Sequence, residues 1–199
     1  MIGIVDYGAG NLRSVEKAFD FLGFETRVVD RAEKLEHVER LVLPGVGAFG
    51  SAARRLKEFG ILGLVKEWLM ADRPFLGICL GLQLLFEGSE ESAEERGLAL
   101  FRGSCRRLEA RKVPQIGWNS IQVLAESALL DGLPRQSHFY FVHSYRAVPE
   151  EEEITIARTD YGGPFPSVVG RGRVWGVQFH PEKSGALGLE LLSNWVRRC

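Results

Sequence analysis

Short apolar segments alternate with amphipathic stretches through the first 86 residues of this 199-residue sequence. Apolar residues recur at helical spacing between Asn11 and Leu22, whereas Ile2–Val5 has the length of a buried strand. Strands that are separated by helices pair in parallel, so this alternation predicts a layered α/β fold. The strands expected in this half are Ile2–Val5, Thr26–Val29, Leu41–Leu43 and Pro74–Ile78, and the helices are Asn11–Leu22, Ser51–Phe59, Ile61–Met70 and one that starts with Leu80–Phe86.

Stretches with β character dominate the second half of the chain. They are Leu98–Phe101, Ser120–Leu124, Phe139–Val142, Ile154–Ala157, Val168–Val169 and Val174–Phe179, followed by a helix from about Ala186 to Val196. The polar run Glu87–Arg96 is interpreted as a solvated loop, and the acidic run Glu150–Glu153 as a solvated turn rather than a metal site. No repeat or linker divides the sequence, so we expect one domain over residues 1–199.

The bulk composition narrows the class of protein. The chain is 45% hydrophobic and 26% charged with a formal net charge of −1, which does not favour a nucleic acid or an anionic membrane as partner. No apolar run approaches the roughly 20 residues that span a bilayer, and no basic segment precedes the first apolar stretch. The three cysteines, Cys79, Cys105 and Cys199, lack metal-ligand spacing. They fit a reducing compartment, so we expect a cytoplasmic protein without a metal.

The segment Gly77-Ile78-Cys79-Leu80-Gly81 has the spacing of a nucleophile elbow, with cysteine in place of serine. A sharp turn from strand to helix would present the Cys79 thiol, and the glycines would remove Cβ atoms that clash in such a turn. The helix start would favour the thiolate, and the N–H of Leu80 could bond a developing oxyanion. On this motif alone, a buried structural cysteine beside flexible glycines remains an alternative; the strand–turn–helix context favours a nucleophile.

The segment Val177–Glu182 ends the last strong strand. Residues two apart on an extended segment point to the same side, so His180 and Glu182 are expected to face one site. A carboxylate bonded to one ring nitrogen fixes the tautomer and leaves the other nitrogen free for a thiol. A histidine beside a glutamate is more often an ordinary surface pair, but this one follows a strand of the expected sheet, where active-site loops lie.

Two glycine-rich loops follow expected strands. Pro44–Gly50 could supply backbone N–H groups to an oxyanion, or cradle a phosphate. It lacks the GK[ST] ending of a P-loop, which makes phosphate the weaker interpretation. Gly8-Ala9-Gly10 lacks the third glycine of a dinucleotide fingerprint, so it does not favour NAD binding.

Together these segments resemble the class I glutamine amidotransferases, over the whole chain. The family's fold is a three-layer α/β arrangement with a mixed, mostly parallel central sheet flanked by helices. The motifs are GICLGLQ around Cys79, QFHPEKS around His180 and Glu182, and PGVG at Pro44–Gly47. Four further segments are similar to the branch of this family that serves histidine biosynthesis: DYGAGN at Asp6–Asn11, PGVGAFG at Pro44–Gly50, IGWN at Ile116–Asn119 and YFVHSY at Tyr140–Tyr145.

The resemblance implies a glutaminase that works with a partner. Cys79 would attack the side-chain amide of L-glutamine and form a γ-glutamyl thioester, while His180 transfers protons and Glu182 orients His180. Ammonia would pass to a (β/α)8 cyclase subunit in a heterodimer, and the glutaminase would need no cofactor. By the same resemblance, the oxyanion hole would comprise Val46, Gly47 and Leu80, the substrate site Gln83, His143, Ser144 and Tyr145, and the partner interface or gate Asn11, Tyr140 and Lys183.

Other interpretations remain at this stage. A glutaminase for another synthase, such as that of pyridoxal phosphate, would be expected to carry a GGES-type loop where this chain has PGVG. A free-standing cysteine hydrolase would need neither an interface nor glutamine. A domain that serves only as a scaffold would not need an intact Cys79, His180 and Glu182. Gln83 could also be a solvent-facing helix residue, and Lys183 a solvated surface lysine.

Overall fold

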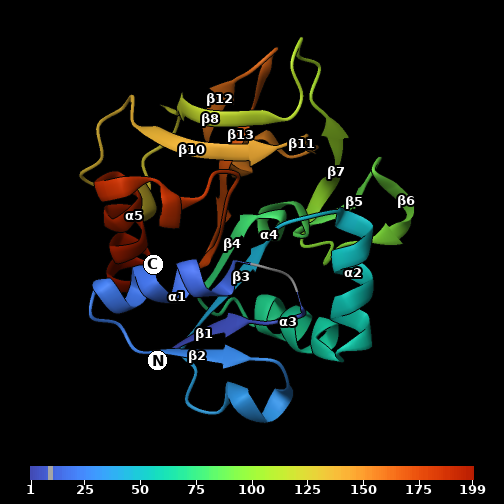
Figure 1. The fold of residues 1–199 in the computed structure, drawn as a ribbon, viewed down its shortest axis with the longest axis vertical. Coiled ribbons are helices and arrows are strands. Elements are labelled where there is room, and N and C mark those ends of the chain that lie inside the picture. The colour runs from blue at the N-terminus through green and yellow to red at the C-terminus, as the bar shows by residue number, and fades with distance from the viewer. Residues whose placement is uncertain (9–10) are drawn as a thin grey trace.

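A computed structural model describes residues 1–8 and 11–199 of the chain. An eight-stranded sheet with the order β2-β1-β3-β4-β14-β13-β12-β9 runs through it (Figure 1). From β2 to β14 neighbouring strands are parallel, and from β14 to β9 they are antiparallel, which confirms a mixed sheet. The strands are β1 (Ile2–Val5), β2 (Thr26–Val29), β3 (Arg40–Gly45), β4 (Phe75–Cys79), β9 (Gln122–Val123), β12 (Thr155–Asp160), β13 (Pro164–Arg171) and β14 (Val174–Val177).

Helices cover both faces of the parallel part of this sheet. The helices α1 (Leu12–Phe21) and α5 (Gly185–Arg198) pack on one face, and α2 (Phe49–Glu58) and α3 (Ile61–Met70) on the other. Alternate residues of a strand serve opposite cores: Leu41 and Leu43 of β3 join the α2–α3 side, and Val42 joins the α1–α5 side. Strands buried on both faces explain the continuous apolar runs in the sequence.

Two smaller sheets lie beside the large one. One pairs β8 (Gln115–Ser120) with β10 (His138–His143), and the other has the order β11-β7-β5-β6. The strands of the second are β5 (Phe86–Ser89), β6 (Ser92–Arg96), β7 (Phe101–Arg107) and β11 (Tyr145–Pro149). We call these two sheets the outer sheets, and we call β1–β4 with β14 the parallel core.

The structure corrects the expected helix after Cys79. The helix α4 (Leu80–Gln83) has only four residues, and Phe86 already begins β5. The main-chain carbonyls of Leu84 and Leu85 accept hydrogen bonds from Leu98 and Leu100 of the returning chain. Because those carbonyls are paired with the returning chain, the helix ends despite its helical spacing.

The run Glu87–Arg96 is also different from the expected solvated loop. It lies largely in the antiparallel pair β5–β6, with Gly88 opposite Arg96. Its residues pair across a partly exposed ribbon, which composition alone does not distinguish from a loop.

Several bounds shift in the second half. The strand expected at Leu98–Phe101 starts only at Phe101, and the expected strand Ser120–Leu124 is divided between β8 and β9. The acidic run ends in a short 3-10 helix at Glu152–Ile154, and the preceding Glu151 pairs with Arg171.

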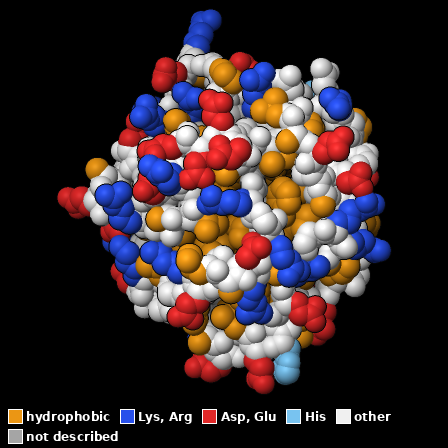
Figure 2. Space-filling view, turned by 180° about the vertical axis from the view of Figure 1, so that it is seen from behind, with side chains coloured by type: hydrophobic (Ala, Val, Ile, Leu, Met, Phe, Trp, Pro, Cys, Tyr) orange, Lys and Arg blue, Asp and Glu red, His pale blue; other side chains and the backbone are white. Residues whose placement is uncertain are grey.

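Among the described residues no helix is long and apolar enough to cross a membrane. Figure 2 shows charged side chains of both signs interspersed over one face of the molecule, with hydrophobic side chains gathered toward its centre.

Candidate active site

Cys79 lies at the end of β4, where the chain turns sharply into α4. Its φ of 55° and ψ of −105° place a non-glycine residue in a region that L-residues rarely adopt. Such strain persists only where the surroundings impose it, and it is typical of functional sites. The local geometry is therefore that of the expected elbow.

The two elbow glycines are required by close contacts. A Cβ on Gly81 would lie 1.8 Å from the main-chain oxygen of Leu43, and one on Gly77 would lie 2.6 Å from the main chain of Gly81. Neither main-chain contact can give way, so larger residues at these positions would separate α4 from β3 and β4. Because α4 has only four residues, its dipole would stabilise a thiolate less than the dipole of the expected longer helix would.

Parallel pairing brings three segments to the same edge of the sheet. Gly45 of β3 pairs with Cys79, and Ile78 of β4 pairs with Val177. The glycine-rich loop, Cys79 and the segment after Val177 therefore meet at the carboxyl ends of β3, β4 and β14, as the sequence predicted.

The main chain of His180 is held by the outer sheet β8–β10. Its N–H donates to the carbonyl of Tyr140 at 2.9 Å, and its carbonyl accepts the Ser184 hydroxyl at 2.6 Å. The same hydroxyl accepts the N–H of Tyr140 at 2.9 Å. Next to His180, the ring of Phe179 stacks on that of Phe139 with centroids 4.1 Å apart, a contact worth about 1 kcal/mol beyond the area it buries.

Glu182 and His180 form a buried pair. The Nδ1 atom of His180 lies 2.8 Å from Oε1 of Glu182, and both side chains are at most 1% exposed. The side-chain amide of Asn11 donates to the same carboxylate oxygen. The pairing agrees with prediction, but its local cause differs: residues 181–183 form a 3-10 turn, so the turn, and not an extended strand, brings the carboxylate to the ring.

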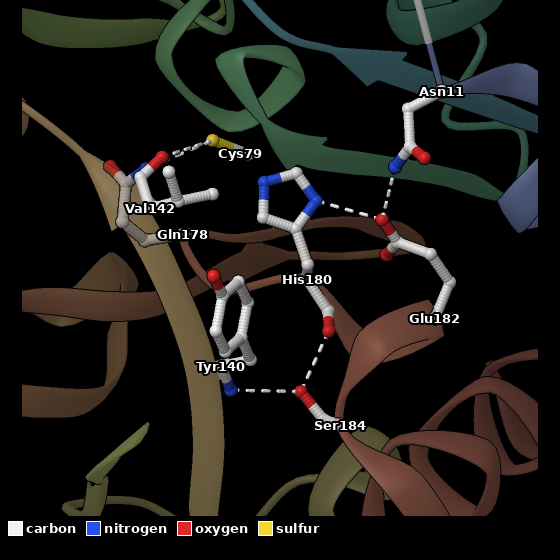
Figure 3. Close-up of polar contacts among 8 residues, drawn as sticks. All are labelled: Asn11, Cys79, Tyr140, Val142, Gln178, His180, Glu182 and Ser184. Atoms are coloured by element: carbon white, nitrogen blue, oxygen red, sulfur yellow. Dashed lines mark hydrogen bonds and ion pairs between the residues drawn. The ribbon is translucent and has the colours of Figure 1, made fainter. Parts of the chain in front are cut away.

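The imidazole lies between the Glu182 carboxylate and the Cys79 sulfur (Figure 3). Its Nε2 side faces Cys79 and makes no hydrogen bond among the described residues. Burial by itself lowers the pKa of His180, but interactions with Cys79 and Glu182 outweigh it and raise the pKa above the ordinary value. The arrangement therefore favours the imidazolium form of His180.

The Cys79 sulfur has two further polar neighbours. It lies 3.8 Å from the carbonyl of Val142 and 3.7 Å from the side-chain Nε2 of Gln178. The first can accept the proton of a thiol, and the second donates to the sulfur. Figure 3 shows these two groups on the side of the sulfur away from His180.

Cys79 opens into a cavity of about 260 Å³. Its wall includes every residue expected in the oxyanion hole and the substrate site. It is lined by Val46, Gly47, Cys79, Leu80, Gln83, Glu91, Pro114, Val142, His143, Ser144 and Tyr145. Gly47 has a φ of 102°, a backbone conformation that residues with a Cβ rarely adopt. A Cβ there would meet no atom within 4 Å, so the backbone conformation, rather than a lack of space, favours glycine at this position.

The expected substrate residues differ in what they offer. Gln83 is only 5% exposed, which excludes the solvent-facing alternative, and its Nε2 donates to the carbonyl of Tyr145 and to Gln178. The Nδ1 atom of His143 also lies 2.9 Å from the Tyr145 carbonyl oxygen, so both lone pairs of that oxygen have a partner. Burial lowers the pKa of His143 to about 4, so a neutral ring supports the wall.

Three residues of this site were absent from the sequence-based prediction. Glu91, in the run interpreted as a loop, lines the cavity and accepts the N–H of Phe49 at 2.7 Å. Ser184 holds the main chain of His180, and Gln178 contacts the sulfur. Gln178 and Ser184 lie within the motif QFHPEKS, but two of their partners, Cys79 and Tyr140, come from strands far away in the sequence.

The residues expected at a partner interface all lie close to the His180–Glu182 pair, but they differ in exposure and direction. Lys183 is exposed, and Tyr140 is half-buried, with its ring 6.3 Å from that of Trp118 on β8. Trp118 and Ile116 are 58% and 61% exposed. We call Ile116, Trp118 and Tyr140 the outer apolar face. Asn11 is turned inward to Glu182 rather than outward.

Neither of the other cysteines has the environment of a nucleophile. Burial raises the pKa of Cys105, whose thiol donates to the carbonyl of Gln83, and burial raises that of Cys199 to about 11. A larger hollow of about 790 Å³ lies between the segment 126–135 and Arg198, but its wall contains neither a cysteine nor a histidine. The smaller cavity beside Cys79 is therefore the candidate site.

Residues 3–199 match the family described as glutamine amidotransferase class-I. The subunit HisH of imidazole glycerol phosphate synthase from Desulfitobacterium hafniense is 50% identical, over 98% of this chain and 95% of that protein. The proteins of the same name from Aquifex aeolicus and Chlorobaculum tepidum are 47% and 45% identical, over 98% of this chain and 95% and 99% of theirs.

Solved structures share the fold at lower identity. A crystal structure described as glutamine amidotransferase superposes with a TM-score of 0.78 at 23% identity, over 98% of both chains. A chain of PurLQS from Thermotoga maritima does so with a TM-score of 0.75 at 19% identity, over 98% of this chain and 96% of that one. At these identities the likeness concerns the fold.

Proposed function

This chain belongs to the class-I glutamine amidotransferases, and from that premise we propose that it is the glutaminase subunit of an imidazole glycerol phosphate synthase. It hydrolyses L-glutamine to L-glutamate and ammonia. The observation that carries the proposal is the buried His180–Glu182 pair beside the strained Cys79, in a chain about half identical to subunits of that synthase. Those relatives favour this synthase over that of pyridoxal phosphate and over a free-standing hydrolase.

The reaction begins with the thiol. His180 takes the proton of Cys79, and the sulfur attacks the side-chain carbonyl carbon of glutamine. The carbonyl oxygen becomes an oxyanion beside the N–H groups of Leu80 and of the loop at Val46 and Gly47. When the tetrahedral intermediate collapses, the carbon–nitrogen bond breaks, and His180 returns the proton to the nitrogen, which leaves as ammonia.

A γ-glutamyl thioester on Cys79 remains. His180 then takes a proton from water, and the hydroxide attacks the thioester carbonyl. The carbon–sulfur bond breaks, glutamate leaves, and the thiol regains its proton. Glu182 stabilises the imidazolium in both halves and keeps Nε2 directed to the sulfur, and the Asn11 amide fixes Glu182 in turn.

The cavity wall fits an amino acid. Glu91 is the only carboxylate among the lining residues, and its position between the outer sheet and α2 suits the ammonium group of glutamine. Gln83, His143, Ser144 and Tyr145 enclose the same end of the substrate. Since Glu91 already accepts one main-chain N–H, it is held in place before the substrate arrives.

We further propose a heterodimer with a (β/α)8 cyclase in the cytoplasm. The cyclase would use the ammonia to form imidazole glycerol phosphate and aminoimidazole carboxamide ribotide. The outer apolar face supports this partner, because β10 carries Tyr140 on that face and Val142 beside the thiol. Lys183 and Asn11 would lie near the contact, on either side of Glu182.

The test measures glutamate release by the chain alone, with the cyclase subunit, and with the cyclase and its nucleotide ligand. We expect the rate to rise with the liganded cyclase, and Cys79→Ala to lower it at least about 10⁴-fold. Ammonium salts should still support product formation by the Cys79→Ala complex, because they bypass the thiol. Glutamine-dependent turnover by Cys79→Ala at the wild-type rate would refute the proposal.

A further inference from the structure

Gln178 is a fully buried amide whose two ends contact different parts of the site. It is 0% exposed and follows β14 directly. Its main-chain N–H donates to the carbonyl of Ser167 at 2.9 Å, which fixes the residue to β13. The side chain is therefore free to serve the site while the backbone is held by the sheet.

The Nε2 end of Gln178 donates to the Cys79 sulfur at 3.7 Å. The Oε1 end accepts Nε2 of Gln83 at 3.1 Å, and Gln83 in turn donates to the carbonyl of Tyr145 at 2.8 Å. This forms a chain of hydrogen bonds from the substrate cavity wall to the reacting sulfur. Because Oε1 is held by a donor, the amide is oriented with its N–H groups toward Cys79.

The partners of the sulfur favour different protonation states. The Val142 carbonyl can only accept, so it favours a thiol that donates its proton. The Gln178 amide donates, so it favours the thiolate. Without the amide, the sulfur would retain a carbonyl as its nearest fixed polar neighbour on that side, and the thiolate would lose a buried donor.

We propose that Gln178 is a further catalytic residue, whose amide stabilises the Cys79 thiolate and links it to Gln83 in the substrate pocket. The proposal rests on the proposed function in one respect, namely that Cys79 is the nucleophile. It adds a source of thiolate stabilisation that comes from the protein itself, independent of His180 and of the short α4.

The test is the pH profile of Cys79 alkylation by iodoacetamide, without glutamine or partner. Only the thiolate reacts, so the rate follows the thiolate fraction. The alkylated peptide is identified by mass spectrometry, which separates Cys79 from Cys105 and Cys199. For Gln178→Met, which keeps the shape but not the donor, we expect the midpoint to rise by about one pH unit and the rate at neutral pH to fall about tenfold.

Three further variants separate the proposed role from a folding defect. Gln178→Glu keeps an acceptor for Gln83 and replaces the donor by a negative charge, so its midpoint should rise further than that of Gln178→Met. Gln83→Met breaks only the far link and should raise KM for glutamine more than it moves the midpoint. The matched control is Asn194→Leu, which removes a buried amide on α5 that bonds the carbonyls of Leu129 and Asp131. It should lower the melting temperature without moving the midpoint.

An unchanged midpoint in both Gln178 variants, with the melting curve showing folded protein, would overturn the assignment. A shift in Asn194→Leu equal to that in Gln178→Met would also overturn it, because general destabilisation would then explain the effect. Failure of the proposed function gives a different result: Cys79→Ala would retain glutaminase activity, whatever the alkylation profile.

Discussion

The parallel core and the outer sheets contribute different parts of the site. The ends of β3, β4 and β14 carry the glycine-rich loop, Cys79 and the segment to His180. The outer sheets supply the wall around them, with Val142 and His143 from β10, and Glu91 from the turn between β5 and β6. The proposed reactive groups thus lie at the ends of strands that are packed on both faces, and the proposed recognition groups lie largely in sheets that also face solvent.

This difference indicates how the two regions tolerate change. In the parallel core, main chains approach so closely that even a Cβ at Gly77 or Gly81 would meet another main chain. The positions of the groups there are therefore closely constrained, as catalysis requires. The outer sheets have exposed surface, including the outer apolar face, and can vary there without disturbing the core. Changes in the core should affect chemistry or folding, and changes in the outer sheets should affect binding.

The largest effect is expected where the core is tightest. In Gly81→Ala the new Cβ would meet the main-chain oxygen of Leu43, so we expect urea unfolding to show a loss of at least about 3 kcal/mol and activity to disappear. Gly63→Ala, at an open position in the first turn of α3, is the control and should gain up to about 1 kcal/mol. Equal stability of the two variants would mean that the core is not closely constrained.

The next largest effect concerns the base. His180→Asn should lower kcat for glutamine by about 10²–10⁴-fold, and Glu182→Gln should lower it less, because His180 remains. Since Glu182 helps to raise the pKa of His180, its loss should move the alkaline limit of activity to lower pH. A more damaging Glu182→Gln, or a limit that moves upward, would reverse the assigned roles.

A wall residue should change binding rather than chemistry. Glu91→Gln keeps an acceptor for the Phe49 N–H but loses the charge, so KM for glutamine should rise about 10–100-fold while kcat changes little. Glu94→Gln, exposed on the adjoining strand β6, is the control and should leave both constants unchanged. If Glu91→Gln lowered kcat instead, the division between core and outer sheets would fail.

The outer apolar face should matter only with the partner. Trp118→Ala should weaken binding of the cyclase subunit by about 30-fold, as measured by titration calorimetry, while the melting temperature stays near wild type. Met70→Ala, an 81% exposed residue on α3, serves as the control. Wild-type affinity in Trp118→Ala would place the partner on another surface.

The smallest effect is expected at Lys183. Lys183→Ala should lower the imidazole product formed per glutamate released by less than about twofold, because an exposed lysine that pairs with a carboxylate of the partner would contribute little. Both products are measured in one reaction, with the exposed Lys66→Ala as control. An unchanged one-to-one ratio would remove Lys183 from the transfer of ammonia.

The sequence predicted the parallel core well because its signals are local. The strand expected at Pro74–Ile78 is displaced by one residue at each end from β4, and the helix Ile61–Met70 has the expected bounds. Each element there combines a continuous apolar run or a helical period with a clear turn. The residues proposed as the triad were predicted for the same reason, since Cys79 ends β4 and His180 and Glu182 follow β14.

The strands and site residues of the outer sheets could not be predicted from local sequence patterns in the same way. In β8 the apolar Ile116 and Trp118 point outward and Gln115 is buried, which inverts the pattern of a half-buried strand. Glu91 was not predicted as a site residue because it lies in the run interpreted as a loop. Its place in the cavity wall depends on pairing between β5 and β6. The contact of Gln178 with the sulfur depends on where β4 and β14 end, which no local pattern specifies.

The central claim is that Cys79 carries the γ-glutamyl group during turnover. The most direct measurement is peptide mass spectrometry after acid quench of the glutamine reaction, using the chain with liganded cyclase. We expect a glutamyl adduct on the peptide that contains Cys79, none on those with Cys105 or Cys199, and none in Cys79→Ala. Steady turnover with the adduct on another residue, or undiminished turnover by Cys79→Ala, would contradict the account.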